Sequence, residues 1–243
     1  FKKWKKKMHR VDMAIDTNHY PPLKKKINKL KERKFLYIGN DYKFNNYSKN
    51  TNFFQNIISS YPKGNFGSMG NKRFVGATNY GWADFKKKKF QKIISTYDFL
   101  IMTSNHDANP TTILEAMSWG LIPVVTKECG YFKHKGIINI PLDNLKKTID
   151  ILDKLQNISE KKLLTIFRYN QNNVKIKYSW KRINNIIYKN ILSNKKYQKI
   201  TFSKKEIDKF NFYEEKSLNY PFKIENMFSF LKTSLKFFFI HNK

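Results

Sequence analysis

Short apolar runs alternate with segments of helical spacing from Lys34 onward. The runs are six or seven residues long and are bounded by turn residues, which is typical of buried strands. They are KFLYIG (34–39), NFGSMG (65–70), RFVGAT (73–78), DFLIMTS (98–104), LIPVVT (121–126) and GIINIPL (136–142). A further run, VDMAID (11–16), is a candidate for a short strand.

The segments between these runs carry apolar residues at helical spacing. Residues 50–61 place Phe53, Phe54 and Ile57 on one face and stop at Pro62. A helix over 85–97 is predicted with Asp84 as its cap, and another over 110–119 that stops at Gly120. Three more helices are predicted over 143–155, 159–178 and 178–192.

Strands that alternate with helices in this way predict βαβ units and a parallel sheet. Right-handed crossovers place helices on both faces of such a sheet. The predicted fold is therefore α/β, a Rossmann-like doubly wound sheet. Ligands of these sheets bind at the carboxyl ends of the strands, which directs attention to the loops after Gly39, Thr78, Ser104 and Thr126.

Three regions are expected along the chain. Residues 1–33 are basic and contain Pro21-Pro22, so they read as a linker or as the end of a preceding domain. This reading fits a chain that begins at Phe1. Residues 34–192 form the α/β domain, and 193–243 form a C-terminal extension. Its aromatic segment 226–240 is too short to span a bilayer. An amphipathic helix at a membrane surface and a terminal helix packed on another domain remain equal alternatives for it.

The chain is strongly basic, with 48 Lys and Arg against 18 Asp and Glu and a net charge of +30 at pH 7. Such a charge suggests a polyanionic partner. The excess is mostly Lys spread along a chain rich in Asn, Ile and Phe, as A/T-rich codons would produce. No zinc-finger spacing, RNP-like motif or Arg-rich arm is present, so no nucleic-acid partner is expected.

The single cysteine, Cys129, cannot form a disulfide within the chain, and the five histidines show no metal-ligand spacing. No metal is expected. The start of the chain does not resemble a signal peptide. A cytoplasmic location is expected, with peripheral contact at the cytoplasmic membrane face as one alternative.

Two acidic residues flank the junction between the strand 98–104 and the helix 110–119. Asp107 lies in the strand-end loop, and Glu115 lies inside the helix. The first amides of the helix, near 109–112, lack intrahelical acceptors and, with the helix dipole, form an anion site suited to a diphosphate. Thr111 and Thr112 add hydroxyl donors. A solvated Asp before an ordinary Rossmann helix is the alternative reading.

The run DANPTTILEAMSWGLIPVVT (107–126) resembles the E-x7-E signature of family-4-type retaining glycosyltransferases (glycosyl transferases group 1), which have the two-domain B-type (GT-B) fold. The resemblance is to the C-terminal, donor-binding domain and spans about residues 34–192. It implies that Asp107 contacts hydroxyls of the donor hexose as a catalytic residue. It further implies that Glu115 holds the ribose, and that Ala108, Asn109, Pro110, Thr111 and Thr112 surround the phosphates.

The sequence departs from the family pattern at several of these positions. The first acid is Asp instead of Glu, and Ala108-Asn109-Pro110 replaces a Gly-rich loop. Gly39 is followed by Asn40 where the family has Arg. The exact phosphate contacts of the loop 108–110 therefore stay open, and Gly39 and Asn40 remain candidates for donor binding.

Other elements of the family pattern have weaker counterparts. KNTNFF (49–54) resembles the family's K-G-x-x-x-L segment. This makes Lys49 the first candidate for the phosphate lysine, with a catalytic role like that of Asp107, and Lys43 the second. Either lysine could be an ordinary surface residue. Gly130, after the VVT strand, is expected where the backbone passes close to the donor. Tyr80 or Trp82 could stack on the nucleobase, although core packing explains Trp82 equally well.

The resemblance implies transfer of a hexose from a nucleoside-diphosphate sugar, of UDP or GDP type, to a glycan or lipid-linked acceptor with retention, in glycan or lipopolysaccharide biosynthesis. The nucleotide sugar is a substrate, and no cofactor is expected. Two other classes stay open: a sugar-nucleotide epimerase of similar build, and a non-catalytic module that binds nucleotide sugars.

Overall fold

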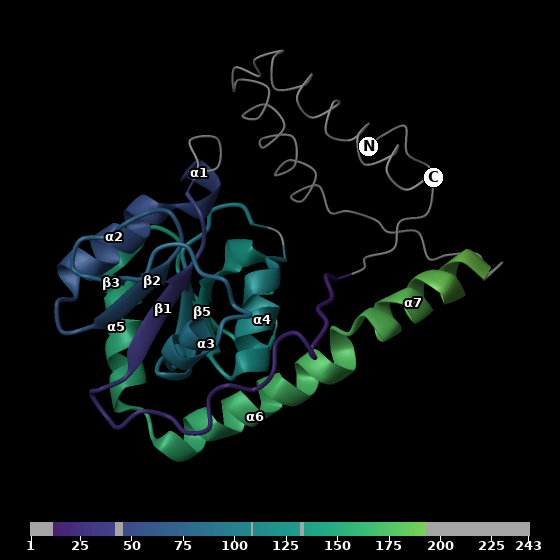
Figure 1. The fold of residues 1–243 in the computed structure, drawn as a ribbon. Helices are drawn as coiled ribbons and strands as arrows, with labels where there is room; N and C mark the ends of the chain where they lie inside the picture. The colour runs from purple at the N-terminus through teal and green to yellow at the C-terminus, as the bar shows by residue number, and fades with distance from the viewer. Residues whose placement is uncertain (1–11, 42–45, 108, 132–133, 193–243) are drawn as a thin grey trace, which may run out of the picture. The chain divides into compact units, whose positions relative to one another are not determined.

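The computed structural model describes residues 12–41, 46–107, 109–131 and 134–192. These residues contain one parallel sheet with strand order β3-β2-β1-β4-β5-β6 (Figure 1). The strands are β1 (Lys34–Ile38), β2 (Asn65–Met69), β3 (Thr78–Asn79), β4 (Phe99–Met102), β5 (Ile122–Thr126) and β6 (Ile138–Ile140).

Within the described residues, α-helices connect β1 to β2, β3 to β4 and β4 to β5, as in βαβ units, and three more follow β6. They are α1 (Asn46–Lys49), α2 (Thr51–Ser60), α3 (Lys88–Ser95), α4 (Thr111–Trp119), α5 (Leu145–Asn157), α6 (Glu160–Lys177) and α7 (Trp180–Leu192), with a short 3-10 helix at Lys127–Cys129. The predicted α/β doubly wound fold is confirmed. Because the chain proceeds outward in both directions from the β1–β4 pair, the switch point of the sheet lies between these two strands.

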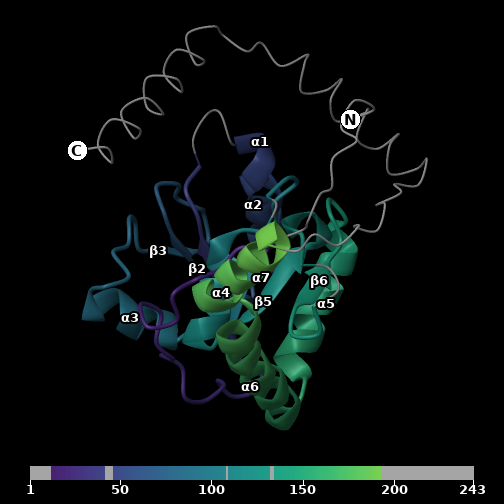
Figure 2. The same cartoon turned by 90° about the vertical axis from the view of Figure 1, so that its right-hand side faces the viewer.

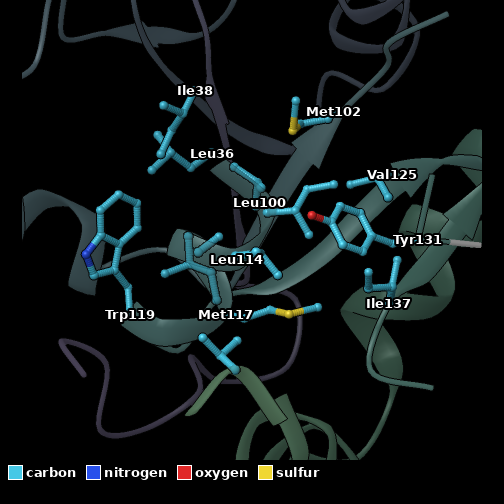
Figure 3. Packing of buried hydrophobic residues seen from close by; sticks show 14 of the residues in the cluster. Leu36, Ile38, Leu100, Met102, Leu114, Met117, Trp119, Val125, Tyr131 and Ile137 are labelled. Atoms are coloured by element: carbon cyan, nitrogen blue, oxygen red, sulfur yellow. The ribbon is translucent and has the colours of Figure 1, made fainter. Parts of the chain in front are cut away.

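The two faces of the sheet are covered by different helices, and β1 shows why. Its side chains alternate, so Leu36 and Ile38 enter one core cluster while Phe35 and Tyr37 enter the other. The first cluster packs the sheet against α3, α4 and the end of α6, and Figure 3 shows Leu36, Leu100 and Val125 facing Leu114 and Met117 of α4. The second packs aromatic rings against α2 and α5, including Phe35 stacked on Phe99 with ring centroids 4.9 Å apart. Helix α3 lies on the β3 side of the sheet and α5 on the β6 side (Figure 2).

Three predicted elements differ from those observed. The strand expected over 73–78 shrinks to Thr78–Asn79, because the Asn79 side chain bonds to Phe74 N, Phe74 O and Ala77 O and closes a turn there. The helix expected from residue 85 begins at Lys88, because Asp84 Oδ1 accepts the N–H of Lys86 in a preceding turn. The VDMAID strand is reduced to an isolated bridge between Ile15 and Ser179.

Residues 12–33, expected as a linker or the end of a preceding domain, pack along the α/β domain. Lys24 and Asp98 form an ion pair of 3.0 Å, with side chains only 1% and 0% exposed. Asp98 also accepts bonds from Asn28 N, Asn28 Nδ2 and Lys34 N. The Leu23 and Lys24 amides both donate to Trp119 O, at the end of α4. All described residues therefore belong to one compact unit.

The C-terminal extension 193–243, with its aromatic segment 226–240, lies outside the described residues. None of the described helices combines the length and the apolar character needed to cross a bilayer.

Candidate functional site

A cleft of about 360 Å³ opens at the carboxyl ends of the strands, where the fold predicts a ligand. Residues from five separate parts of the chain line it: the end of β1, the end of β2, α1, the loop after β3 and the first turn of α4. They are Ile38, Gly39, Asn40, Lys49, Met69, Gly70, Trp82, Ala83, Phe85 and Thr112. The cleft thus includes four residues expected at the donor site: Gly39, Asn40, Lys49 and Thr112.

The floor of the cleft depends on a close approach between the ends of β1 and β2. Gly39 N donates to Met69 O at 3.0 Å. Gly70 has φ 147°, and a Cβ on it would lie 1.9 Å from Gly39 O. A side chain at position 70 would therefore push the two strand ends apart and fill the space between them.

Hydrogen bonds join the loop before α2 to the loop after β4, across the switch point. Asn105 N donates to Ser48 O at 2.8 Å, and Thr103 Oγ1 donates to Asn50 O at 3.0 Å. Asn50 Nδ2 bonds to Asn105 Oδ1 at 2.9 Å and to Asp143 Oδ1 at 3.0 Å. These bonds hold Lys49, the residue just before Asn50, beside the β4 loop.

Lys49 and Asp107 form an ion pair of 2.5 Å, although they are 58 positions apart in the chain. Their side chains are 22% and 20% exposed, so both are mostly buried but still reach solvent. The two residues predicted to be catalytic therefore come together at the cleft.

Asn50 has φ 48° and ψ 48°, in the left-handed region, at the N-cap of α2. Glycine adopts this conformation most easily, and Asn is among the few other residues that tolerate it. The resemblance described above has Gly at this position, and the left-handed backbone of Asn50 is one that Gly adopts readily.

Helix α4 points its amino end at the cleft. Its N-cap, Pro110, is extended, with φ −60° and ψ 130°, and no side-chain hydrogen bond caps the helix. Thr112 in the first turn lines the cleft. The amides of this turn and the helix dipole thus provide an anion-binding position.

Asn109 and Gly130 lie against each other behind this helix end. Asn109 has φ 55° and donates its N–H to Cys129 O at 3.2 Å. A Cβ on Gly130 would lie 2.5 Å from Asn109 Oδ1, and Gly130 itself has φ 83°. Gly130 and Asn109 thus fix the path of the loop into α4, and the approach of the Gly130 backbone to the donor stays a prediction.

Glu115 lies one turn further into α4 and is largely buried. Its carboxylate accepts hydrogen bonds from the Thr111 and Tyr20 hydroxyls. Burial raises the pKa of the Glu115 carboxyl, and the two hydrogen bonds oppose that shift. The role of Tyr20 was missed by the sequence prediction, because this residue lies in the segment interpreted as a linker.

A second cleft of about 380 Å³ adjoins the first and shares Trp82, Ala83 and Phe85 with it. Tyr20 and His19 also line this cleft. Trp82 is 66% exposed, whereas Tyr80 bonds through its hydroxyl to Tyr97 at 2.9 Å and packs on the core. Of the two aromatic candidates, Trp82 is the one whose ring faces the clefts.

A buried acidic group beside Asn40 was not predicted either. Asp41 Oδ2 accepts from Thr51 Oγ1 at 2.8 Å and pairs with Lys72 Nζ at 2.7 Å. Its Oδ1 is buried and has no partner among the described residues. Asp41 follows the first strand-end loop directly, which is the only sequence signal that could have indicated it.

Metal and thiol chemistry find no support in the described part of the chain. It contains no group of three or more His, Cys, Asp or Glu side chains that could hold a metal ion. Burial raises the pKa of the Cys129 thiol to about 11, so this thiol is protonated at neutral pH. Two candidates, Lys43 and Ala108, lie outside the described residues.

Comparison with known proteins gave matches among solved structures only. No protein-family model and no curated protein matches the chain. A glycosyltransferase from Rickettsia africae ESF-5 has a TM-score of 0.58 at 13% identity, covering 76% of this chain and 57% of that one. The C-terminal domain of LpcC, a glycosyl transferase group 1 family protein from Francisella tularensis, has a TM-score of 0.52 at 16% identity, covering 69% of this chain and all of that one.

A third similar structure carries a nucleotide. It is a mutant of S. aureus TarM in complex with fondaparinux, α-GlcNAc-glycerol and UDP, with a TM-score of 0.51 at 14% identity. The match covers 68% of this chain and only 36% of that one, so the chain spans little more than a third of TarM. The similarity at these identities is one of fold: the described domain has the Rossmann-like fold of a domain of GT-B glycosyltransferases.

Proposed function

We propose that this chain binds the donor in a glycosyltransferase that moves a hexose from a nucleoside-diphosphate sugar to a glycan or lipid-linked acceptor with retention. The observation that carries the proposal is the Lys49–Asp107 pair beside the amino end of α4, in a cleft at the switch point of the sheet. A cation, free helix amides and a carboxylate meet there, which are the groups that a sugar diphosphate requires.

Each part of the donor has a matching region. The diphosphate lies at Lys49 and the first turn of α4, near Thr111 and Thr112. The hexose lies at Asp107, and the ribose lies at Glu115. The nucleobase, of a UDP or GDP donor, lies toward the second cleft, beside Tyr20 and His19.

The chemistry follows from this arrangement. When the bond to the anomeric carbon breaks, negative charge develops on the departing diphosphate, and the sugar gains oxocarbenium character. The Lys49 ammonium and the α4 amides stabilise the leaving group, and fixed groups of this kind contribute most when they are oriented before the reaction. Asp107 accepts hydrogen bonds from hexose hydroxyls and orients the sugar. The proposal assigns these roles to the chain's own residues and invokes no cofactor.

Calorimetric titration with UDP, GDP and the corresponding sugar nucleotides tests the site. Lys49→Ala removes a charged contact to phosphate and should weaken UDP or GDP binding by about 10- to 150-fold, without affecting the weak binding of the nucleoside. Glu115→Ala removes the ribose contact and should weaken nucleotide and nucleoside alike.

Asp107→Ala should leave nucleotide binding nearly unchanged and abolish the added affinity that the hexose gives to the intact donor. Lys146→Ala and Asp150→Ala, exposed positions on α5, are the matched controls. Unchanged binding of nucleotide and sugar nucleotide in all three site variants would refute the assignment.

The two other classes are separated by turnover. An epimerase would convert the sugar nucleotide without an acceptor, and a binding module would do neither reaction. Incubation of the donor with and without candidate glycan or lipid-linked acceptors, followed by chromatography of the sugar products, distinguishes the three.

A further inference from the structure

A row of four lysines crosses the start of α3, next to the second cleft. The side chains of Lys86, Lys87, Lys88 and Lys89, here called the lysine strip, are all exposed. None of the described acidic side chains lies within 4.0 Å of their ammonium groups. Asp84, just before them, uses its Oδ1 to accept the backbone N–H of Lys86. The strip therefore keeps its charge largely uncompensated.

The position of these lysines at the amino end of α3 increases the positive electrostatic potential there. Lys87 is the N-cap of α3, and the first turn of this helix contains no acidic residue. Positive side chains are unfavourable at the positive end of a helix dipole unless an anion neutralises them. The strip and the free amides of the turn thus form one anion-attracting surface.

Apolar residues flank the strip and shape this surface. Phe85 and Phe90 are partly buried and pack against the core, so α3 keeps its lysines turned outward. Trp82 is 66% exposed and lines the same cleft as Lys86. A large exposed aromatic ring beside several lysines is the combination found on proteins that rest on a lipid surface, where the ring enters the headgroup region.

We propose that the lysine strip and Trp82 bind the anionic headgroups of a membrane surface. Charge complementarity supports this partner, since clusters of four to eight basic residues attract acidic phospholipids. The all-lysine composition favours a surface of dispersed charges over base recognition in nucleic acid, which relies on the fork of Arg. Docking in this way brings the clefts next to the lipid surface.

Vesicle sedimentation of the full chain tests the proposal. The probes are phosphatidylcholine vesicles with and without about a third of phosphatidylserine. The variant K87Q/K88Q/K89Q leaves Lys86 in place because Lys86 lines the cleft. Each lysine near an anionic leaflet contributes about fivefold to partitioning, so the variant should bind acidic vesicles about a hundredfold more weakly.

The matched control is K146Q/K147Q/K162Q, which removes the same charge from exposed positions on α5 and α6. It should lose no more than about threefold in partitioning, since long-range charge is screened. Equal losses in the two variants would mean that total charge alone drives binding, and the proposal would be wrong. Circular dichroism of both variants verifies folding.

Two further measurements identify the anion and the contact. Full competition by soluble glycerophosphoserine or inorganic phosphate would show a site for a single phosphate and would overturn the membrane proposal. Oligonucleotide binding by K87Q/K88Q/K89Q is measured alongside vesicle binding. A loss of oligonucleotide binding with vesicle binding intact would also overturn the proposal. Quenching of tryptophan fluorescence by brominated lipid should be clearly weaker in Trp82→Phe than in the parent chain. Equal quenching would remove Trp82 from the contact.

Discussion

The pKa of the Glu115 carboxyl depends on two hydroxyl groups, one near it in the sequence and one far from it. Thr111 lies one turn before it on α4, while Tyr20 comes from the segment that precedes the sheet. Both donate to the ionised carboxylate and so oppose the rise in pKa that burial causes. Burial and the Glu115 carboxylate in turn raise the pKa of Tyr20, which keeps its hydroxyl protonated as a donor.

Tyr20→Phe should therefore change the pH dependence of nucleotide binding. In the proposed site, ribose hydroxyls donate to the charged form of Glu115, so binding should be lost as the pH falls through the raised pKa of this carboxyl. Without the Tyr20 hydroxyl that pKa rises further, and the loss moves to higher pH, with little change in affinity at neutral pH. Titration of UDP or GDP across mildly acidic pH measures the midpoint. Tyr188→Phe, at an exposed position on α7, is the control, and identical midpoints in all three proteins would contradict the role of Tyr20.

At the scale of elements, the strand ends form the cleft, and Gly70 shows how little space separates them. Gly70→Ala should destabilise the domain by about 3 kcal/mol or more, because the new Cβ meets the Gly39 carbonyl and φ is unfavourable. Gly81→Ala is the matched control: its φ is 70°, yet a Cβ there meets nothing within 4 Å. It should cost only about 1–2 kcal/mol.

Urea unfolding of the two variants measures the difference. Gly70→Ala should also weaken nucleotide binding, because the floor of the cleft moves. Equal stability of the two variants would show that the β1 and β2 ends can separate without cost.

The sequence predicted the elements that carry a clear pattern of apolar residues. Strands β1, β4 and β5 and helix α4 lie within two residues of their predicted limits, because continuous burial leaves a clear pattern. The strand over 73–78 was wrong because a single side chain, Asn79, satisfies the backbone groups that a ladder would need. The pattern of apolar and polar residues carries no information about such side-chain to backbone hydrogen bonds.

The sequence indicated the candidate residues on the α2 side and on the α4 side of the site. It did not indicate the contacts that join the two sides. Glu115 and the start of α4 could be read from a local run of residues. The contact of Lys49 with Asp107 could not, because it depends on the loop bonds of Asn50 and Asn105 across the switch point. Tyr20 was missed for the same reason: its partner is 95 positions away.

At the scale of the whole molecule, one buried carboxylate, Asp98, collects several of the bonds that attach residues 12–33 to the sheet. Asp98→Ala should destabilise the protein by about 3–5 kcal/mol, since it leaves the Lys24 ammonium buried without its counterion. It also leaves the Asn28 and Lys34 donors unpaired. Asp150→Ala, on the exposed face of α5, should change stability by less than about 0.5 kcal/mol.

Chemical denaturation checks this prediction, and Lys24→Met refines it. Lys24→Met keeps the three other donors to Asp98, so it should lower the free energy of unfolding by less than Asp98→Ala does. A loss for Asp98→Ala no greater than that for Asp150→Ala would mean that the bonds of Asp98 contribute nothing to the attachment of residues 12–33.

The pairing of Lys49 with Asp107 has a consequence for a chain with 48 basic and 18 acidic residues. Inorganic phosphate, free nucleotides and polyanions are attracted to such a molecule wherever a cationic side chain has no acidic partner. Asp107 acts as a built-in counterion for Lys49, so a stray anion must compete with a carboxylate already in place. A donor that offers its diphosphate to the lysine and its hydroxyls to the aspartate satisfies both partners at once. On the proposed assignment, the donor replaces both partners of the Lys49–Asp107 pair, whereas a simple anion replaces only the partner of Lys49 and should bind weakly.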